Sequence, residues 1–154
     1  MKTRRILFTV AFCVSALAAS FAADSNVGTW KLNEAKSKIA AGASKNTSVV
    51  YTAEGDSYKC VTDGVDGKGK PTHSEWTGKF DGKDYPVTGD SNADMRSIKK
   101  EHDGHYKIEN KKAGKTVLSG TVTLSDGDKT RTLKTEGKSA DGKKIESTAV
   151  YDKQ

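Results

Sequence analysis

The sequence predicts an all-β protein, an antiparallel up-and-down β-barrel of about ten strands with one short helix after the first strand. Turn signals that contain glycine recur along the chain at intervals of roughly 8 to 15 residues. Between these turns, apolar and polar side chains alternate with the period of two that is typical of a half-buried strand. Short connections force consecutive strands to pair antiparallel, and closure of such a meander into a barrel removes its exposed edges.

The N-terminal residues have the composition of a secretory signal peptide, which we expect to span residues 1–22. Three basic residues near the start precede an apolar run that ends at Ala19, and Ser20-Phe21-Ala22 forms a small-x-small cleavage pattern. An apolar run of this length is too short for a membrane span. Arg4 and Arg5 are also compatible with a twin-arginine export signal. The pattern predicts a secreted or periplasmic protein.

Composition and charge indicate one small domain, residues 23–154. The chain has 26 Lys and Arg against 20 Asp and Glu, and loss of the signal peptide leaves 23 basic residues. Because these charges are scattered along the chain, they favour neither a nucleic-acid nor a membrane partner. Cys60 is the single cysteine after the signal peptide, so an internal disulfide is excluded. We expect a monomer that carries no cofactor.

The first strand and the predicted helix are adjacent in the chain. Residues 27–32 alternate so that Trp30 lies on the buried face of a strand. Asn33 is a favourable N-cap, and it precedes residues 34–41, which are compatible with a short helix. Gly42 then stands where a helix commonly ends.

Nine further strands are expected between the glycine-containing turns. The stretch 71–90 is predicted to form two strands folded back on each other around Asp81-Gly82, since both central positions of a type I′ turn require positive φ. The alternation predicts strands at residues 47–53, 57–62, 71–80, 83–88, 95–101, 105–111, 116–125, 129–136 and 143–152.

The same alternation identifies the inward face of the barrel. Leu118, Val122 and Leu124 point to one side of their strand, and threonine and serine residues point to the other. Over all strands, the inward face mixes aromatic side chains with serine, alanine, threonine and cysteine. Such a mixture is more compatible with a cavity than with a densely packed aliphatic core.

The opening strand Gly28-Thr29-Trp30-Lys31-Leu32 resembles that of the calycins, both the G-x-W of lipocalins and the GTWKL of intracellular fatty-acid-binding proteins. The number of strands, the helical insert and the ending Val150-Tyr151-Asp152-Lys153 resemble the second group more than the eight-stranded first. The resemblance implies a barrel that binds a small hydrophobic or amphipathic molecule. It also implies that Gly28 and Trp30 are structural residues that close one end of the barrel.

A second resemblance covers nearly the whole domain. The stretch GKPTHSEWTGKFDGKDYPVTGD at 69–90, the segment 94–100 and the closing TAVYDKQ at 148–154 resemble a family of small secreted bacterial proteins. The function of that family is unknown, so this resemblance implies no activity.

The fatty-acid-binding resemblance also concerns the charge that holds a ligand. In that group an arginine two residues before the C-terminal tyrosine helps to hold the ligand carboxylate. Here Tyr151 matches the tyrosine, but the arginine position is occupied by Ala149. Arg96 or Arg131 could supply the charge from another strand.

Aromatic residues at inward positions are the candidate ligand contacts, because aromatic rings with hydroxyl groups can line and orient a small-molecule site. Their ordinary alternative is a structural core. Together with the two arginines, the candidate cavity-lining residues are Tyr51, Tyr58, Trp76, Tyr85, Arg96, Tyr106, Arg131 and Tyr151.

The sequence also contains a possible acid/base pair. His73 and Glu75 share one strand face and could act in hydrolysis or form half of a metal site, but a solvated strand face explains them better. His102 and His105 flank a turn, where we expect exposure. No nucleophile elbow, P-loop or dinucleotide fingerprint is present. We therefore expect neither a metal nor a catalytic set.

The leading hypothesis is a secreted, non-enzymatic barrel that binds a small apolar or amphipathic ligand. The alternative is a filled barrel whose loops bind a protein or polysaccharide in the cell envelope, because loops on a rigid scaffold often carry function. A hydrolytic enzyme that uses His73 and Glu75 is a weaker third hypothesis.

Overall fold

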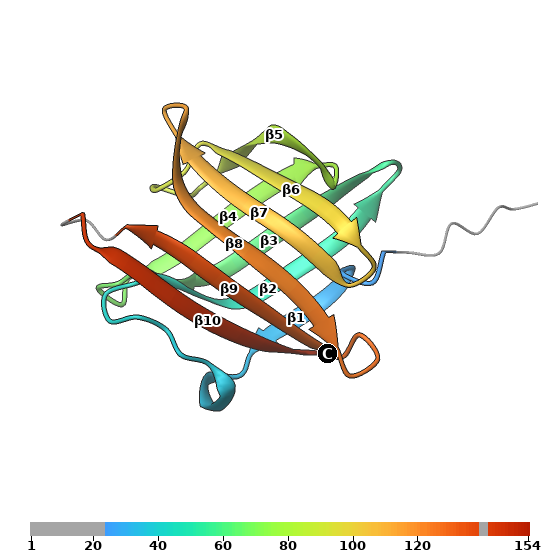
Figure 1. Ribbon diagram of the computed structural model, residues 1–154, viewed down its shortest axis with the longest axis horizontal. Coiled ribbons are helices and arrows are strands. Elements are labelled where there is room, and N and C mark those ends of the chain that lie inside the picture. The colour runs from blue at the N-terminus through green and yellow to red at the C-terminus, as the bar shows by residue number, and fades with distance from the viewer. Residues whose placement is uncertain (1–23, 139–141) are drawn as a thin grey trace, which may run out of the picture.

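The computed structural model describes residues 24–138 and 142–154, so the predicted signal peptide lies outside the described residues. Ten antiparallel strands close into one barrel (Figure 1). The strands are β1 (Gly28–Leu32), β2 (Lys45–Glu54), β3 (Ser57–Val65), β4 (Pro71–Gly78), β5 (Asp81–Thr88), β6 (Met95–His102), β7 (His105–Lys112), β8 (Lys115–Ser125), β9 (Thr130–Lys138) and β10 (Lys144–Lys153).

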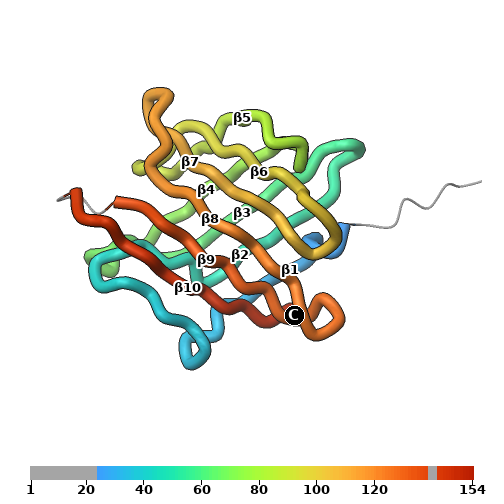
Figure 2. Tube along the Cα trace, viewed as in Figure 1, coloured from blue at the N-terminus to red at the C-terminus, as the bar shows by residue number. Residues whose placement is uncertain are grey.

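Each strand pairs with its neighbours in sequence, and β1 pairs with β10 to close the barrel. The closing register places Trp30 opposite Lys153 and Leu32 opposite Tyr151. Figure 2 shows the chain winding once around the barrel from β1 to β10. The predicted fold class, an all-β up-and-down barrel of ten strands, is confirmed, and it is consistent with a calycin-like fold.

The barrel has two rims, the N-terminal rim and the opposite rim, which differ in the connections that they hold. The N-terminal rim holds the turn at residues 24–27 and the β2–β3, β6–β7 and β8–β9 connections, at the right of Figure 1. The opposite rim holds the β1–β2 segment, residues 33–44, and the β3–β4, β5–β6 and β7–β8 connections. Side chains inside the barrel therefore lie closer to one rim or the other according to their position along a strand.

The predicted helix at 34–41 is wrong. Only a single 3-10 turn, η1 (Glu34–Lys36), forms in this segment. The side chain of Asn33 caps it as expected, accepting a hydrogen bond from the backbone N–H of Lys36 at 3.1 Å. The next residues leave the helical path because Lys38 exchanges two backbone hydrogen bonds with Thr148 of β10, at 2.7 and 2.8 Å. Pairing with the sheet thus outcompetes the local helix.

The predicted two-residue turn at Asp81-Gly82 is also wrong in detail. Gly82 has a positive φ of 81°, but Asp81 does not, and both residues belong to β5. β4 and β5 are antiparallel neighbours, as expected, yet their register contains only the pairs Glu75 with Thr88 and Trp76 with Val87. Near the N-terminal rim, the two strands are therefore joined by side-chain packing instead of a backbone ladder.

The interior is filled unevenly along its length. Near the N-terminal rim and at mid-height, large aromatic side chains are almost completely buried. Toward the opposite rim, inward positions of β8, β9 and β10 carry smaller residues that keep partial exposure. The buried hydrophobic core consists of Trp30, Val49, Tyr51, Cys60, Trp76, Val87, Ala93, Ile98, Tyr106, Ile108, Val122, Leu124, Ala149 and Tyr151.

Candidate functional site

An aromatic cluster lies around Phe80, in the connection between β4 and β5. The ring of Phe80 stacks on Tyr58 with centroids 4.1 Å apart and an interplanar angle of 4°. It meets the rings of Tyr51 and Tyr106 edge to face, at 6.0 and 5.3 Å. Offset and edge-to-face contacts of this kind stabilise the cluster beyond the area that it buries. The cluster fills the gap that the short β4–β5 ladder leaves.

Arg131 of β9 is the most deeply buried charged residue of the site, with 2% of its surface exposed. Its Nε atom donates a hydrogen bond to the Oδ1 atom of Asn26 at 3.2 Å. The guanidinium carbon lies 5.8 Å from the ring centroid of Tyr51 and 5.4 Å from that of Tyr151, both cation–π distances. Its Nη1 atom is buried and has no hydrogen-bond partner among the described residues. An unpartnered buried guanidinium nitrogen is costly in free energy.

Arg96 of β6 also points into the barrel. Its Nε atom donates to the Oδ1 atom of Asn110, the residue opposite it on β7, at 2.8 Å. Its backbone carbonyl accepts a hydrogen bond from the indole of Trp76 at 3.1 Å. The nearest carboxylate is that of Asp90, 3.9 Å from Nη2, at the limit of an ion pair. The charge of Arg96 is therefore compensated only weakly.

Arg131 and Arg96 both affect the pKa values of two buried side chains inside the barrel, Tyr51 and Cys60. Burial raises the pKa of the Tyr51 hydroxyl far above its ordinary value, and Arg131 and Arg96 oppose that rise. Burial likewise raises the pKa of the Cys60 thiol, again against the two arginines. Tyr51 and Cys60 are therefore protonated at neutral pH and can donate hydrogen bonds. The positive charges of β6 and β9 converge on this point, which makes the interior favourable for an anion.

The turn at residues 24–27 covers the N-terminal rim. The carboxylate of Asp24, 5% exposed, accepts hydrogen bonds from the Tyr106 hydroxyl and from the Lys100 ammonium, the latter at 2.9 Å. The backbone carbonyl of Asn26 accepts a hydrogen bond from the indole of Trp30 at 2.9 Å. Hydrogen bonds to Asp103 and Asp24 raise the pKa of Lys100, so its ammonium stays protonated at neutral pH. The turn is thus fastened to the barrel by side chains.

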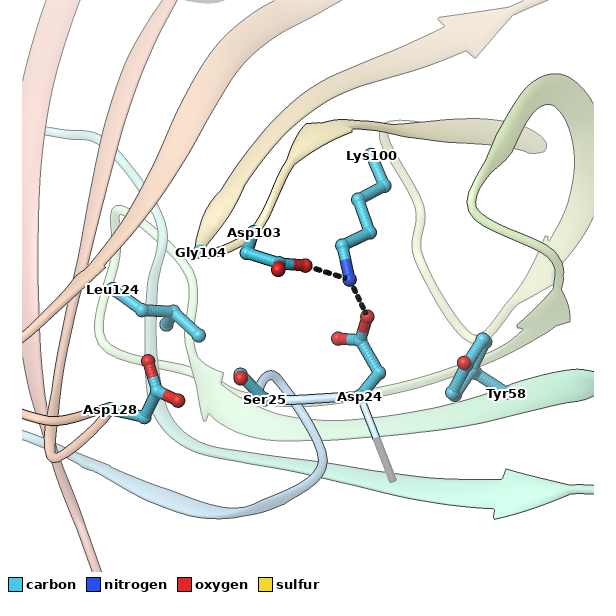
Figure 3. Close-up of a pocket in the computed structure, with 8 residues that line it drawn as sticks. All are labelled: Asp24, Ser25, Tyr58, Lys100, Asp103, Gly104, Leu124 and Asp128. Carbon is cyan, nitrogen blue, oxygen red and sulfur yellow. Dashed lines mark hydrogen bonds and ion pairs between the residues drawn. The ribbon is translucent and has the colours of Figure 1, made fainter. Parts of the chain in front are cut away.

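A pocket of about 530 Å³ lies at the N-terminal rim beside this turn (Figure 3). Figure 3 shows the Lys100 ammonium between the carboxylates of Asp24 and Asp103, with the ring of Tyr58 on one side and Leu124 on the other. The pocket is lined by Asp24, Ser25, Tyr58, Lys100, Asp103, Gly104, Leu124 and Asp128. Its walls are mainly polar, and its charges are largely paired with each other.

The inner wall near the opposite rim offers a different surface. Inward positions of β8, β9 and β10 are only partly buried, so apolar and small side chains keep some exposed surface there. A second pocket, of about 190 Å³, lies beside Leu32 and Ile39 at this rim. The partly exposed inward residues, here called the inner wall, are Leu118, Gly120, Leu133, Thr135, Gly137, Ile145 and Ser147.

The predicted ligand residues gather inside the barrel. Tyr51, Trp76, Arg96, Tyr106, Arg131 and Tyr151 are buried there, and Tyr58 and Tyr85 lie partly exposed at its margin. The ring of Tyr85 packs edge to face on Trp76, and its hydroxyl donates to Asp81 at 3.0 Å. Trp30, predicted to close one end, is fully buried at the N-terminal rim beneath the Lys153 ammonium, 5.0 Å from its ring centroid.

Sequence reasoning missed the two asparagines that hold the arginines. Asn110 shares the inward face of β7 with Tyr106 and Ile108, so its position in the alternation could have identified it. Asn26 precedes the first strand and lies in no periodic pattern. No signal in the sequence places it beside Arg131, because that contact depends on the path of the turn.

The predicted acid/base pair lies on the outer face of the barrel. His73 Nδ1 is 2.7 Å from the Asp63 carboxylate, and His73 Nε2 is 3.4 Å from Glu75. Glu75 in turn pairs with Lys59 at 2.9 Å. All these side chains are at least one-third exposed to solvent, and none of them lines either pocket described above. The array resembles a surface charge network more than a catalytic site.

The remaining histidines show no metal geometry. His102 and His105 face each other across the β6–β7 turn with ring centroids 4.1 Å apart. Within residues 24–138 and 142–154, no group of three or more His, Cys, Asp or Glu side chains is arranged to hold a metal ion. In the same residues, no helix has the length and hydropathy needed to span a membrane.

No protein family matches the sequence, and no curated protein matches it either.

Proposed function

We propose that this barrel binds a small amphipathic molecule in its interior, non-covalently, with a negatively charged end directed toward Arg131. The observation that carries the proposal is the buried Nη1 atom of Arg131, which has no partner among the described residues. Burial of a guanidinium without a carboxylate costs several kcal/mol, on the order of the buried-charge penalties seen in proteins. A carboxylate, sulfonate or phosphate group of a ligand would supply the missing partner.

The rest of the interior supports a ligand with an apolar part. The inner wall presents accessible leucine, isoleucine and small residues, which suit a hydrocarbon or aromatic body. The ring of Tyr51 lies against the Arg131 guanidinium, so an aromatic surface borders the position proposed for the anionic group. Polar and apolar side chains thus both occupy inward positions of the barrel, as an amphipathic ligand requires.

Two further parts of the proposal concern location and chemistry. We propose that the protein works outside the cytoplasm, on the support of the signal-peptide pattern in residues 1–22. We also propose that it binds without catalysis, since the acid/base candidates His73 and Glu75 lie on the outer face, away from Arg131.

The first test is native mass spectrometry of the protein purified from its own secretion route. A ligand that is bound in the barrel adds mass under native conditions and is lost on denaturation. The second test is titration with the anionic fluorophore 8-anilinonaphthalene-1-sulfonate. We expect Arg131→Met to weaken its binding about tenfold, as the loss of one buried charged contact predicts, and Arg131→Lys to retain most of the affinity. A bare polypeptide mass together with no fluorophore binding would contradict the proposal.

A filled barrel that binds a macromolecule is the second candidate. The observation that favours it is the aromatic packing near the N-terminal rim, where Tyr106 and Tyr151 are each 1% exposed. In that case a protein or polysaccharide of the envelope would bind the loops. Affinity purification should then recover a stoichiometric partner, and native mass spectrometry should show no small molecule.

A further inference from the structure

Both arginines inside the barrel are held by amides. Arg131 Nε donates to Asn26 Oδ1 at 3.2 Å, and Arg96 Nε donates to Asn110 Oδ1 at 2.8 Å. Asn26 is 1% exposed and Asn110 is 8% exposed. An amide oxygen fixes the orientation of a guanidinium as a carboxylate does, but it brings no negative charge. The positive charge therefore stays available.

The two arginine–asparagine pairs differ in how much of the arginine charge remains uncompensated. Asp90 lies 3.9 Å from Arg96 Nη2 and compensates it in part. Among residues 24–138 and 142–154, no carboxylate forms an ion pair with Arg131, and Nη1 of that residue has no partner. Arg131 is consequently the stronger of the two positive centres. This difference provides an internal comparison for a test.

Each asparagine is itself held in place. The backbone N–H of Asn26 donates to Asp24 Oδ1 at 3.0 Å, and its carbonyl accepts from the Trp30 indole at 2.9 Å. Asn110 is fixed by the register of β7 opposite Arg96. The side chains of both asparagines are thus aimed at their arginines by elements that do not depend on a ligand.

We infer that Asn26 and Asn110 are specificity-determining residues, which position Arg131 and Arg96 and leave their charge for an anionic group of the ligand. The inference rests on the proposed function, and it adds the residues that make the barrel select an anionic amphiphile over a neutral one. A carboxylate of the same shape at position 26 would hold Arg131 equally well but would neutralise it. The choice of asparagine therefore sets the ligand charge.

The isosteric substitution Asn26→Asp tests this directly. The probes are 8-anilinonaphthalene-1-sulfonate, which is anionic, and N-phenyl-1-naphthylamine, which has a similar body and no charge at neutral pH. We expect Asn26→Asp to weaken binding of the anionic probe about tenfold or more and to leave binding of the neutral probe within about twofold. Equal weakening of both probes would indicate a structural role only and would overturn the inference.

Melting temperatures give a readout that needs no ligand. Asn26→Asp should raise the melting temperature, because a buried arginine gains a carboxylate, whereas Asn26→Ala should lower it by removing the hydrogen bond. Asn110→Asp should give a smaller rise, because Arg96 already faces Asp90. If Asn26→Asp lowers the melting temperature as Asn26→Ala does, Arg131 is not an uncompensated charge and the inference fails.

The probe titrations and the melting temperatures together distinguish failure of the inference from failure of the proposed function. If the unmodified protein binds neither probe and carries no ligand, the proposed function fails and the selective role of the asparagines fails with it. The melting temperatures of the Asn26 variants still decide whether the amide leaves Arg131 uncompensated. If the unmodified protein binds both probes and Asn26→Asp preserves both affinities, the proposed function stands and the inference is overturned.

Discussion

Asn26 and Arg131 meet inside the barrel although 105 positions separate them in the chain. Their hydrogen bond joins the turn at residues 24–27 to β9, and Asp24 anchors the same turn to β6 and β7 through Lys100 and Tyr106. The turn closes the N-terminal rim and also orients the buried guanidinium. A substitution at Asp24 should therefore alter the orientation of the Arg131 guanidinium.

The first prediction concerns that anchor. Asp24→Asn should lower the free energy of unfolding by about 1–3 kcal/mol, because it weakens the contacts of a buried carboxylate with Lys100 and Tyr106. Urea denaturation measures the change. Asp103→Asn is the matched control, because Asp103 pairs with the same lysine at 2.8 Å but its side chain is 95% exposed. The control should stay within about 0.5 kcal/mol of the unmodified protein, and equal losses would contradict the prediction.

The second prediction is that removal of the Arg131 charge stabilises the fold although it weakens ligand binding. Arg131→Met should raise the free energy of unfolding by about 1 kcal/mol, because it replaces an uncompensated buried charge with an apolar chain of similar length. The gain is reduced by the loss of cation–π contacts with Tyr51 and Tyr151. Thermal and urea denaturation measure the change. A loss of several kcal/mol would mean that Arg131 is a structural core residue, fully satisfied by its ring contacts and by Asn26.

The third prediction concerns the gap between β4 and β5. Phe80→Ala should lower the free energy of unfolding by about 3 kcal/mol, at the low end of the cost of removing an aromatic core side chain, because Phe80 is only partly buried against the core. The loss should be large because only two residue pairs join the strands here, so the Phe80 ring replaces missing backbone pairing. Phe80→Leu, which keeps an apolar side chain, should lose less than half as much. Similar losses for both variants would show that ring stacking, and not volume, holds the gap.

The fold was predictable because the alternation of apolar and polar side chains determines which face of each strand is buried. A shift of one residue would turn Val122 and Leu124 outward and their threonine neighbours inward, so the buried face fixes each strand. The helix after β1 was not predictable from local signals. Asn33 is a real cap, but the backbone of Lys38 finds partners on Thr148 of β10, more than a hundred residues away. Pairing with a distant strand therefore outweighs the local preference of this segment for a helix.

The candidate site was predictable only for residues inside strands. Tyr51, Arg96 and Arg131 occupy inward positions that follow from period-two alternation. Asn26 could not be found in this way, because it belongs to an irregular turn. The Asp81-Gly82 error has a related cause: the Asp-Gly pair indicates a bend, but β5 begins with this pair and the connection falls at Phe80.

The last prediction concerns pH and the charge array on the outer face. Hydrogen bonds to Asp63 and then to Glu75 raise the pKa of His73 above its ordinary value of about 6.5. Because the pKa is higher in the folded than in the unfolded protein, the stabilising contribution is complete below the unfolded value. It is lost as the pH rises through the folded value. Lys59 forms an ion pair with Glu75 and partly neutralises that carboxylate, so the contribution of Glu75 to the pKa shift of His73 is reduced.

The variant His73→Gln should therefore be less stable than the unmodified protein at about pH 5.5, and the difference should vanish at about pH 8.5. Urea denaturation at a series of pH values measures the difference. The effect should be small, because His73 is half exposed and solvent screens its pairs. Asp63→Asn should remove most of the same pH dependence, because Asp63 is the closer partner of the imidazole at 2.7 Å. A difference that is constant with pH would mean that His73 contributes by packing and not by charge.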